Sequence, residues 1–253
     1  MQNIRNGLRL TPTTDIKLWK QLVFFSLGFI GLTVTSLLIE VAVVLYGKSA
    51  YPNPYDYSIF VSSTGVNMFM NGAAYLIVFV VFICLIQGDI EEFLKSFKGW
   101  KPYVAAAIGF SAILVFNITY NSILNILNVS ISDNANESSL NTMVTDFPFT
   151  SIVIFALVGP VVEELTYRVG LFSLLKRVHI SLAYIVTIVV FTLIHFDFTT
   201  SNLTNELLNI PFYAFAAGTF CFLYHRYGLA SSAAAHITNN LFSVLATIIG
   251  NFK

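Results

Sequence analysis

Three ionisable side chains fall within six positions of one apolar segment, residues 148–175: Glu163, Glu164 and Arg168. An ionisable group inside a membrane-spanning helix costs about 2.5 kcal/mol or more on insertion, so each is a functional candidate. Glu164 and Arg168 stand four residues apart, on one helical face, where they can form an ion pair. Glu163 is rotated by about 100° from Glu164. It must therefore find its partner on another helix or in water.

Two histidines in other apolar segments can supply that partner. His195 lies near the end of one segment and His236 lies in the first half of the last, with Asn240 four residues further on the same face. Glu163 and two imidazoles could hold Zn²⁺ with an open fourth position. Alternatively, Glu163 and one histidine could polarise water directly while the other histidine and Asn240 donate to an oxyanion. Both routes hydrolyse an acyl bond, and the residues leave both open.

Each of these residues also has a purely structural interpretation. A Glu–Arg pair in a membrane is often architectural, and a single membrane histidine is more often a hydrogen-bonded packing residue. Asn240 alone would be interhelical glue. The occurrence of all of them on three segments of one chain favours function.

Composition predicts where these segments reside. Apolar residues make up 56% of the 253 residues and charged residues only 10%, with a mean hydropathy of +0.76. A soluble domain carries about 25% charged residues, so lipid is the expected solvent. The net charge is zero and gives no argument for nucleic-acid binding. Cys84 and Cys221 lie in apolar runs and indicate small buried side chains rather than a disulfide.

The fold predicted from these runs is an all-α polytopic membrane bundle of about seven transmembrane helices. Each run approaches the 20 or so residues that cross a bilayer. We expect one integrated membrane domain, with helices 1–3 in residues 1–146 and helices 4–7, the catalytic core, in residues 147–253. Residues 48–65 and 128–146 are predicted loops. The predicted spans are 22–46, 68–86, 102–127, 148–175, 181–196, 207–224 and 229–249.

A polar stripe lies along the second half of the third predicted span. It consists of Asn117, Asn121 and Asn125. We expect interhelical hydrogen bonds from it, and a water path stays open as an alternative.

Orientation follows from the thirteen Lys and Arg residues. With seven spans, ten of them share one side, Lys48 and Lys253 take the other, and Arg168 lies in the membrane. Positive charge marks the cytoplasmic side, so we expect a cytoplasmic N-terminus and a site in a wet cavity open to the cytoplasm. The ten are Arg5, Arg9, Lys17, Lys20, Lys95, Lys98, Lys101, Lys176, Arg177 and Arg226.

The order of the motifs resembles a known family. The pattern is similar to the CPBP family, also called Abi, which includes the type II CAAX prenyl endopeptidases and bacterial proteases of bacteriocin processing and immunity. The resemblance covers roughly residues 147–252. The motifs that carry it are Glu163-Glu164-x-x-x-Arg168, Phe191-x-x-x-His195 and His236-x-x-x-Asn240.

The resemblance implies an intramembrane endopeptidase and a role for each motif residue. Members are named metalloproteases, yet a metal-free, glutamate-driven mechanism has also been argued for them, so Zn²⁺ bound by Glu163, His195 and His236 and a metal-free site are equally open. The implied roles are water activation by Glu163, water holding by His195, oxyanion stabilisation by His236 and Asn240, and support from the Glu164–Arg168 ion pair.

Two other functions compete with this one. A non-catalytic membrane scaffold or regulator could keep the fold, but no motif residue is missing. A transporter or proton relay would show inverted repeats and broken helices, which the sequence lacks. A prenylated tail, a bacteriocin or signalling peptide and a membrane-anchored regulator are all open as substrates. The many Ile, Asn and Phe residues indicate an AT-rich genome, so a bacterial plasma membrane and peptide substrates are expected.

Overall fold

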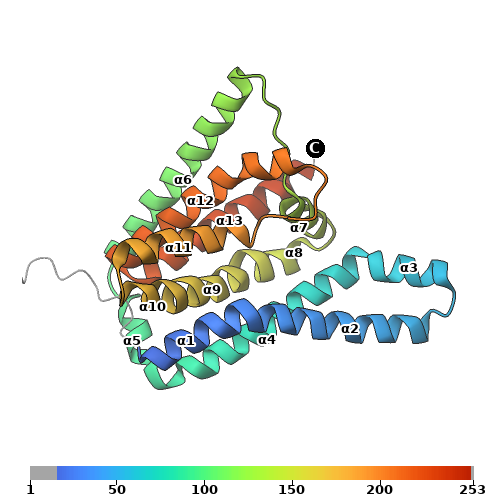
Figure 1. Cartoon of the computed structure of the whole chain (residues 1–253), viewed down its shortest axis with the longest axis horizontal. Helices are drawn as coiled ribbons and strands as arrows, with labels where there is room; N and C mark the ends of the chain where they lie inside the picture. Colours follow the sequence, from blue (N-terminus) through green and yellow to red (C-terminus); the bar gives the residue numbers. More distant parts are fainter. Residues whose placement is uncertain (1–15, 252–253) are drawn as a thin grey trace, which may run out of the picture.

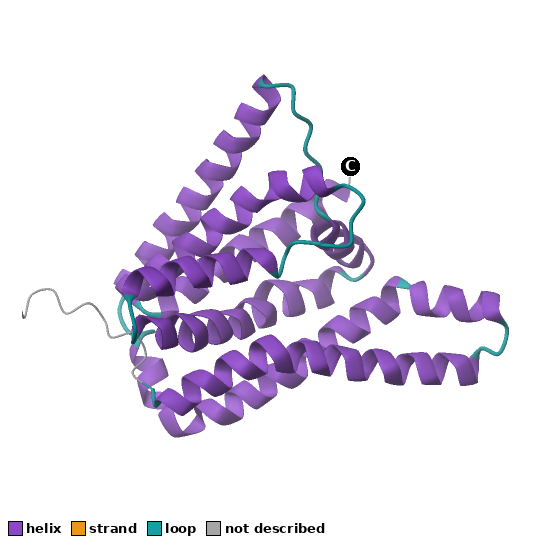
Figure 2. Ribbon diagram, viewed as in Figure 1, coloured by secondary structure: helices purple, strands orange, loops and turns teal. Residues whose placement is uncertain are grey.

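The computed structural model describes residues 16–251, and that part of the chain is helical with no strand (Figure 2). Arg5, Arg9 and Lys253, used above to predict orientation, lie outside the described residues. The N-terminal elements are α1 (Leu18–Ser26), η2 (Leu27–Gly31), α2 (Leu32–Ala50), α3 (Pro54–Ser62), α4 (Thr64–Ile86), η3 (Gln87–Asp89), α5 (Ile90–Lys95) and α6 (Lys101–Ile126). The C-terminal elements are α7 (Ala135–Asp146), α8 (Pro148–Ser151), η4 (Ile152–Val158), α9 (Gly159–Glu163), η5 (Glu164–Phe172), α10 (Ser173–Lys176), α11 (Ile180–Leu193), α12 (Leu203–Tyr227) and α13 (Leu229–Asn251).

Six helices of the described chain are long and apolar enough to cross a membrane. Consecutive elements merge into three of them, Leu18–Ala50, Thr64–Lys95 and Pro148–Lys176. The fifth predicted span is α11, which has only 14 residues and a length of about 21 Å. The all-α membrane bundle is confirmed, with six full-length spans and one short apolar helix.

One end of the bundle carries basic side chains from several helices. Lys20 donates from Nζ to Leu85 O at 2.9 Å and forms an ion pair with Asp89. Arg177 donates from Nε to Gln21 Oε1 at 2.8 Å. The beginning of α1, the end of α4 and the end of α10 therefore meet at one end, called the basic end below.

The helix α7 lies across the opposite end of the bundle (Figure 1). The first N–H of α7 donates to Glu206 Oε1 at 3.0 Å, near the beginning of α12. Asn134 donates from Nδ2 to His195 O at 3.0 Å, and Thr247 near the end of α13 donates to Asn141 Oδ1 at 2.9 Å. This is called the α7 end.

The short helix α11 runs from one end to the other. Near its beginning, Tyr184 Oη lies 3.1 Å from His225 Nδ1 at the end of α12. Just after its last residue, His195 contacts the loop that precedes α7. Seven segments thus alternate in direction between the two ends, although α11 is shorter than a full span.

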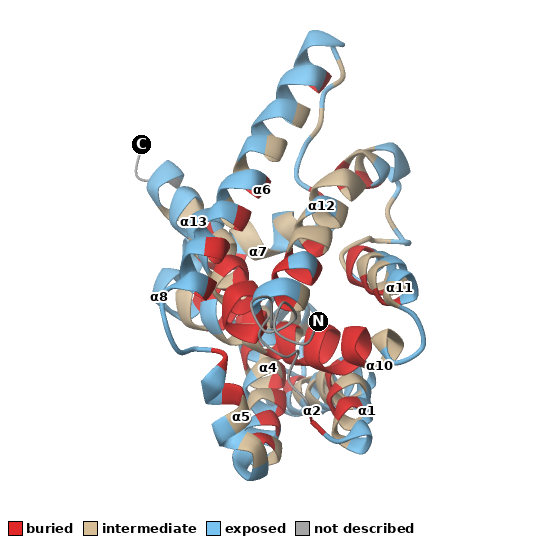
Figure 3. Ribbon diagram, turned by 90° about the vertical axis from the view of Figure 1, so that its left-hand side faces the viewer, coloured by how far each residue is buried: buried red, intermediate tan, exposed pale blue. Residues whose placement is uncertain are grey.

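The helix Pro148–Lys176 forms the centre of the bundle. Just over half of its apolar window is buried, against a third or less in the other five long helices, and all nine residues of η5 are buried (Figure 3). Two wide π-helical stretches, η4 and η5, interrupt its α-helical turns. Such stretches occur frequently at functional sites.

The first helix packs very closely on this central helix, and two glycines allow it. A Cβ atom on Gly170 would lie 2.7 Å from the backbone nitrogen of Phe25. A Cβ atom on Gly28 would overlap the side chain of Thr166. Small residues let membrane helices approach without a large side chain between them. This contact fixes the N-terminal helix against the segment that bears Glu163.

Both predicted loops contain a helix, so those two loop predictions are wrong. In residues 48–65, Asn53 caps α3 by accepting from Tyr55 N at 2.9 Å, and Pro54 takes the first helical position. In residues 128–146, Asn134 caps α7 by accepting from Glu137 N at 2.8 Å. Asparagine caps and a proline at the first position start helices even in polar segments.

Large apolar side chains cover the outer surface of the bundle. Leu38 is 65% exposed and Ile108 is 67% exposed, on α2 and α6. Water would penalise so much apolar surface, whereas lipid does not. The helix α6 leans away from the bundle towards its C-terminal end (Figure 1).

Candidate active site

The three sequence motifs meet at one cavity of about 240 Å³ inside the bundle. Its wall comes from α4, α7, the central helix, the end of α11, α12 and α13. The motif residues that line it are Glu163, Phe191, His195, His236 and Asn240.

Glu163 lies where α9 ends and η5 begins, with its side chain 13% exposed towards the cavity. Its Oε1 accepts a hydrogen bond from Tyr75 Oη at 3.2 Å. Its Oε2 lies 3.7 Å from His236 Nε2. That separation is too long for a direct hydrogen bond and suits a bridging water. The carboxylate is thus fixed on one side and faces an imidazole nitrogen on the other.

His236 connects the two neighbouring glutamates. Its Nδ1 lies 3.0 Å from Glu164 Oε1 and donates to that carboxylate. Its ring stacks on Phe220 with centroids 4.5 Å apart. The Nδ1–H bond fixes the ring orientation, so that Nε2 is directed at Glu163.

Glu164 and Arg168 form the ion pair expected from their spacing, with Arg168 Nη1 3.2 Å from Glu164 Oε1 and neither side chain exposed. The guanidinium carbon lies 4.6 Å from the ring centroid of Phe191 and 5.3 Å from that of Phe220. Aromatic faces stabilise a desolvated cation. This pair lies behind His236, outside the cavity wall, and so supports the site without facing a substrate.

His195 lies in the turn that follows α11. Its Nδ1 is 2.8 Å from Phe191 O. A carbonyl oxygen can only accept, so Nδ1 carries the hydrogen, and Nε2 of the neutral ring is an acceptor. The ring stacks on Tyr213 at 4.6 Å. Nε2 is therefore available to hold a water hydrogen in the cavity.

Asn240 donates from Nδ2 to Phe155 O at 3.1 Å. In η4 the backbone follows the π register, as Gly159 N donates to Ile154 O. The next carbonyl in that register, Phe155 O, would need the N–H of residue 160, which is a proline. Asn240 supplies the missing donor, and its second N–H is left for the cavity.

Tyr75 is the residue that the motifs did not reveal. It belongs to α4, in the part of the chain that carries none of the three motifs. Asn71 and Tyr75 both line the cavity and stand four residues apart in an otherwise apolar span. That polar face was the available signal.

The cavity is lined by α7 and not by residues of the basic end. Asn136, Glu137 and Leu140 of α7 contribute to its wall. The cavity therefore lies in the half of the bundle nearer the α7 end, whereas its opening was expected at the basic end. The distribution of Lys and Arg, on which that expectation was based, carries no information about the position of α7.

The metal alternative was tested on the donor atoms. The described residues contain no group of three His, Cys, Asp or Glu side chains placed to hold a metal ion. Glu163 and His236 are close, but His195 does not complete a ligand set with them in this arrangement. The three candidates therefore do not fit a metal as they stand.

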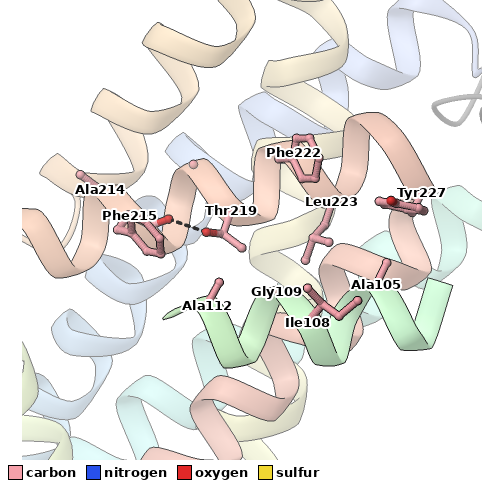
Figure 4. Close-up of a pocket in the computed structure, with 11 residues that line it drawn as sticks. Ala105, Ile108, Gly109, Ala112, Ala214, Phe215, Thr219, Phe222, Leu223 and Tyr227 are labelled. Carbon is pink, nitrogen blue, oxygen red and sulfur yellow. Dashed lines mark hydrogen bonds between the residues drawn. The ribbon is translucent and has the colours of Figure 1, made fainter. Parts of the chain in front are cut away.

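A second, larger cavity of about 440 Å³ lies between α6 and α12 near the basic end (Figure 4). Small and apolar side chains such as Gly109, Ala112 and Leu223 line it, and Tyr227 is its one ionisable lining group. This cavity carries no pair of groups for acid–base chemistry. The smaller cavity is the candidate active site.

Residues 145–242 match the family model described as type II CAAX prenyl endopeptidase Rce1-like. The matched segment contains every motif residue and excludes Tyr75. This match confirms the family resemblance of the motifs; it covers less than half of the chain and supports, at family level, an intramembrane protease in a lipid environment. No curated protein and no solved structure matched the chain.

Proposed function

We propose that this protein is an endopeptidase that cleaves a peptide bond within the membrane, using a water molecule activated by Glu163. The observation that carries the proposal is the position of this carboxylate in a polar cavity, 3.2 Å from Tyr75 Oη and 3.7 Å from His236 Nε2. A carboxylate held by one donor and open to water on its other oxygen suits a general base.

In the proposed reaction, Glu163 takes a proton from water as the water oxygen attacks the carbonyl carbon of the substrate. His195 Nε2 accepts the other water hydrogen and holds the nucleophile. The free N–H of Asn240 donates to the oxyanion, and His236 adds a second donor when both of its ring nitrogens carry hydrogen. The C–N bond then breaks, and Glu163 returns its proton to the leaving amine.

The metal-free route is proposed because Glu163, His195 and His236 do not form a metal-ligand set as they stand. Each imidazole has its Nδ1 engaged, to Phe191 O in His195 and to Glu164 in His236, which leaves one Nε2 each for water and substrate. The family also admits a Zn²⁺ route through Glu163, His195 and His236. A chelator separates the two, because only a metal-dependent enzyme loses activity.

The proposed orientation puts the basic end in the cytoplasm, by the distribution of Lys and Arg, in a bacterial plasma membrane. The cavity is lined from the α7 end, so the substrate would reach it from the non-cytoplasmic side. A peptide processed at that face fits this entry.

Thiol labelling tests the orientation. In a cysteine-free background, Asn136→Cys on α7 is expected to react with a membrane-impermeant maleimide in intact cells. Lys98→Cys, in the loop before α6, is the matched control and should react only after permeabilisation. The reverse pattern would overturn the orientation and leave the protease assignment untouched.

Activity is tested with purified wild type and Glu163→Gln in detergent, on a quenched peptide library with and without a chelator. Glu91→Gln, an exposed residue of α5, is the control for the loss of a carboxylate. We expect cleavage by wild type and the control, none by Glu163→Gln, and no effect of the chelator. If Glu163→Gln cleaves as well as wild type, the assignment of the base is wrong. Absence of cleavage by all three, across substrates that enter from either side, favours the non-catalytic scaffold.

A further inference from the structure

A third cavity, of about 420 Å³, lies next to the candidate active site, between α6, α7, α12 and α13. Five residues line both it and the catalytic cavity, so the two spaces share one wall. The shared residues are Glu137, Tyr213, Ala216, Asn239 and Ser243. A group that occupies the third cavity therefore lies beside the substrate peptide bond that Glu163 is proposed to cleave.

The charged side chains around the two cavities are acidic. Asp133, Glu137 and Glu163 contribute carboxylates to their walls, and no Lys or Arg side chain of residues 16–251 lines either one. Within that part of the chain, the two histidines of the site are the only nitrogen bases there. The joined space is therefore suited to a positive group and unsuited to a negative one.

Glu137 is the carboxylate on the shared wall, and within the described chain no ion pair or side-chain hydrogen bond engages it. Its position three residues after the cap Asn134 would allow a capping box. In the structure the only bond of that box is the one from Glu137 N to Asn134 Oδ1. Burial, and then the nearby Asp133, raise the pKa of Glu137. A carboxylate is thus held where its charge is penalised and no protein cation compensates it.

The third cavity also contains an acceptor without a donor. Asn117 Oδ1 is buried and has no hydrogen-bond partner, although its residue lines the cavity together with Asn121. The interhelical hydrogen bonds expected from the asparagine stripe are absent at this oxygen. An ammonium or guanidinium group has several N–H donors and no acceptor, so it is the kind of group that pairs with the acceptors of Asn117 and Glu137, both of which line this cavity.

We propose that the third cavity receives a Lys or Arg side chain of the substrate, and that Glu137 is the residue that selects it. The protease would then prefer peptides with a basic residue close to the cleaved bond. This inference rests on the proposed function for its meaning, but the binding of the basic side chain does not depend on catalysis.

The test uses two peptides that differ at one position, lysine against norleucine, with that position moved along the sequence. Binding is measured by fluorescence to Glu163→Gln, which keeps both cavities and is expected not to cleave. At the best position we expect the lysine peptide to bind about 10- to 100-fold more tightly, the range for a hydrogen bond to a charged group. Adding Glu137→Gln should bring the ratio close to one.

Asp146→Asn is the matched control, because Asp146 is an exposed carboxylate at the end of the same helix and lines neither cavity. It should keep the lysine preference. Should Glu137→Gln unfold, Asp133→Asn is the second variant, with a smaller fall expected. The proposal would be overturned if the ratio of lysine-peptide to norleucine-peptide affinity were the same with and without the Glu137 carboxylate. It would also be overturned if lysine were preferred at no position. Lysine-selective binding without any cleavage by wild type would support this site and count against the protease instead.

Discussion

Glu163 and Glu164 are adjacent in the sequence, yet replacing each with glutamine should have opposite consequences. Glu163 faces the cavity and accepts one hydrogen bond, from Tyr75. Glu164 is fully buried and contacts Arg168 at 3.2 Å and His236 at 3.0 Å. Glu163→Gln should therefore remove activity and keep the fold, whereas Glu164→Gln should weaken the fold itself.

The magnitudes follow from what each substitution leaves behind. Glu164→Gln leaves the buried guanidinium of Arg168 without its carboxylate, and breaking a buried ion pair costs about 3–5 kcal/mol. At about 2–4 °C per kcal/mol for a chain of this size, the melting temperature should fall by about 6–20 °C. Glu163→Gln keeps an acceptor for Tyr75 Oη and converts a hydrogen bond to a charged group into a neutral one, a difference of about 1 kcal/mol. Its melting temperature should stay within about 6 °C of wild type.

Stability is measured by thermal unfolding of both variants in one detergent. Activity is measured by the cleavage assay, run below the unfolding temperature of either variant. The expected result is a stable, inactive Glu163→Gln and a destabilised Glu164→Gln. Equal melting temperatures for Glu164→Gln and wild type would refute the reasoning, because the Arg168 charge would then not depend on that carboxylate. A larger fall in melting temperature for Glu163→Gln than for Glu164→Gln would refute it as well.

Three further substitutions test other contacts. Tyr75→Phe removes the donor to the catalytic carboxylate, and kcat should fall about tenfold, the value of one hydrogen bond to a charged group, with little change in KM; an unchanged kcat would remove Tyr75 from the site. Gly170→Ala puts a Cβ atom 2.7 Å from a backbone nitrogen of α1 and should cost about 1–3 kcal/mol in denaturant unfolding, whereas Gly250→Ala, with open space around it, should cost nothing comparable. Burial raises the pKa of Glu137, so the stability linked to its neutral form is present below the ordinary glutamate pKa and is lost as the pH rises through the folded pKa. Glu137→Gln should therefore melt above wild type at neutral pH and level with it in acid, and a gain at acidic pH alone would contradict the sign.

Apolar length in the sequence was enough to predict the long helices, because a membrane span must satisfy its own backbone hydrogen bonds. The short helices α3 and α7 escaped prediction for the complementary reason. Both are too short to span a membrane, and each starts at an asparagine cap, Asn53 or Asn134. Hydropathy carries no information about such caps.

The site was predictable where local spacing determines geometry and not where tertiary contacts do. The four-residue spacing of Glu164 and Arg168 implied their ion pair, and the structure has it at 3.2 Å. The hydrogen bond from His236 to Glu164 joins residues 72 positions apart, and no local pattern indicates it. Tyr75 is 88 positions from Glu163, and no local pattern indicates their hydrogen bond either. Long-range partners of a buried charge follow only from the packing.

Asn240 illustrates how one residue can be assigned correctly to the cavity and still have a second task. Its family-like position implied a donor to an oxyanion, and its side chain does line the cavity. One of its two N–H groups is nevertheless taken by Phe155 O, which has lost its backbone donor because residue 160 is proline. The wide helical turn, the proline and the asparagine therefore depend on one another. Replacing Asn240 would leave a buried carbonyl unpaired as well as remove a donor, so a loss of activity in such a variant is evidence about catalysis only if its stability is measured beside it.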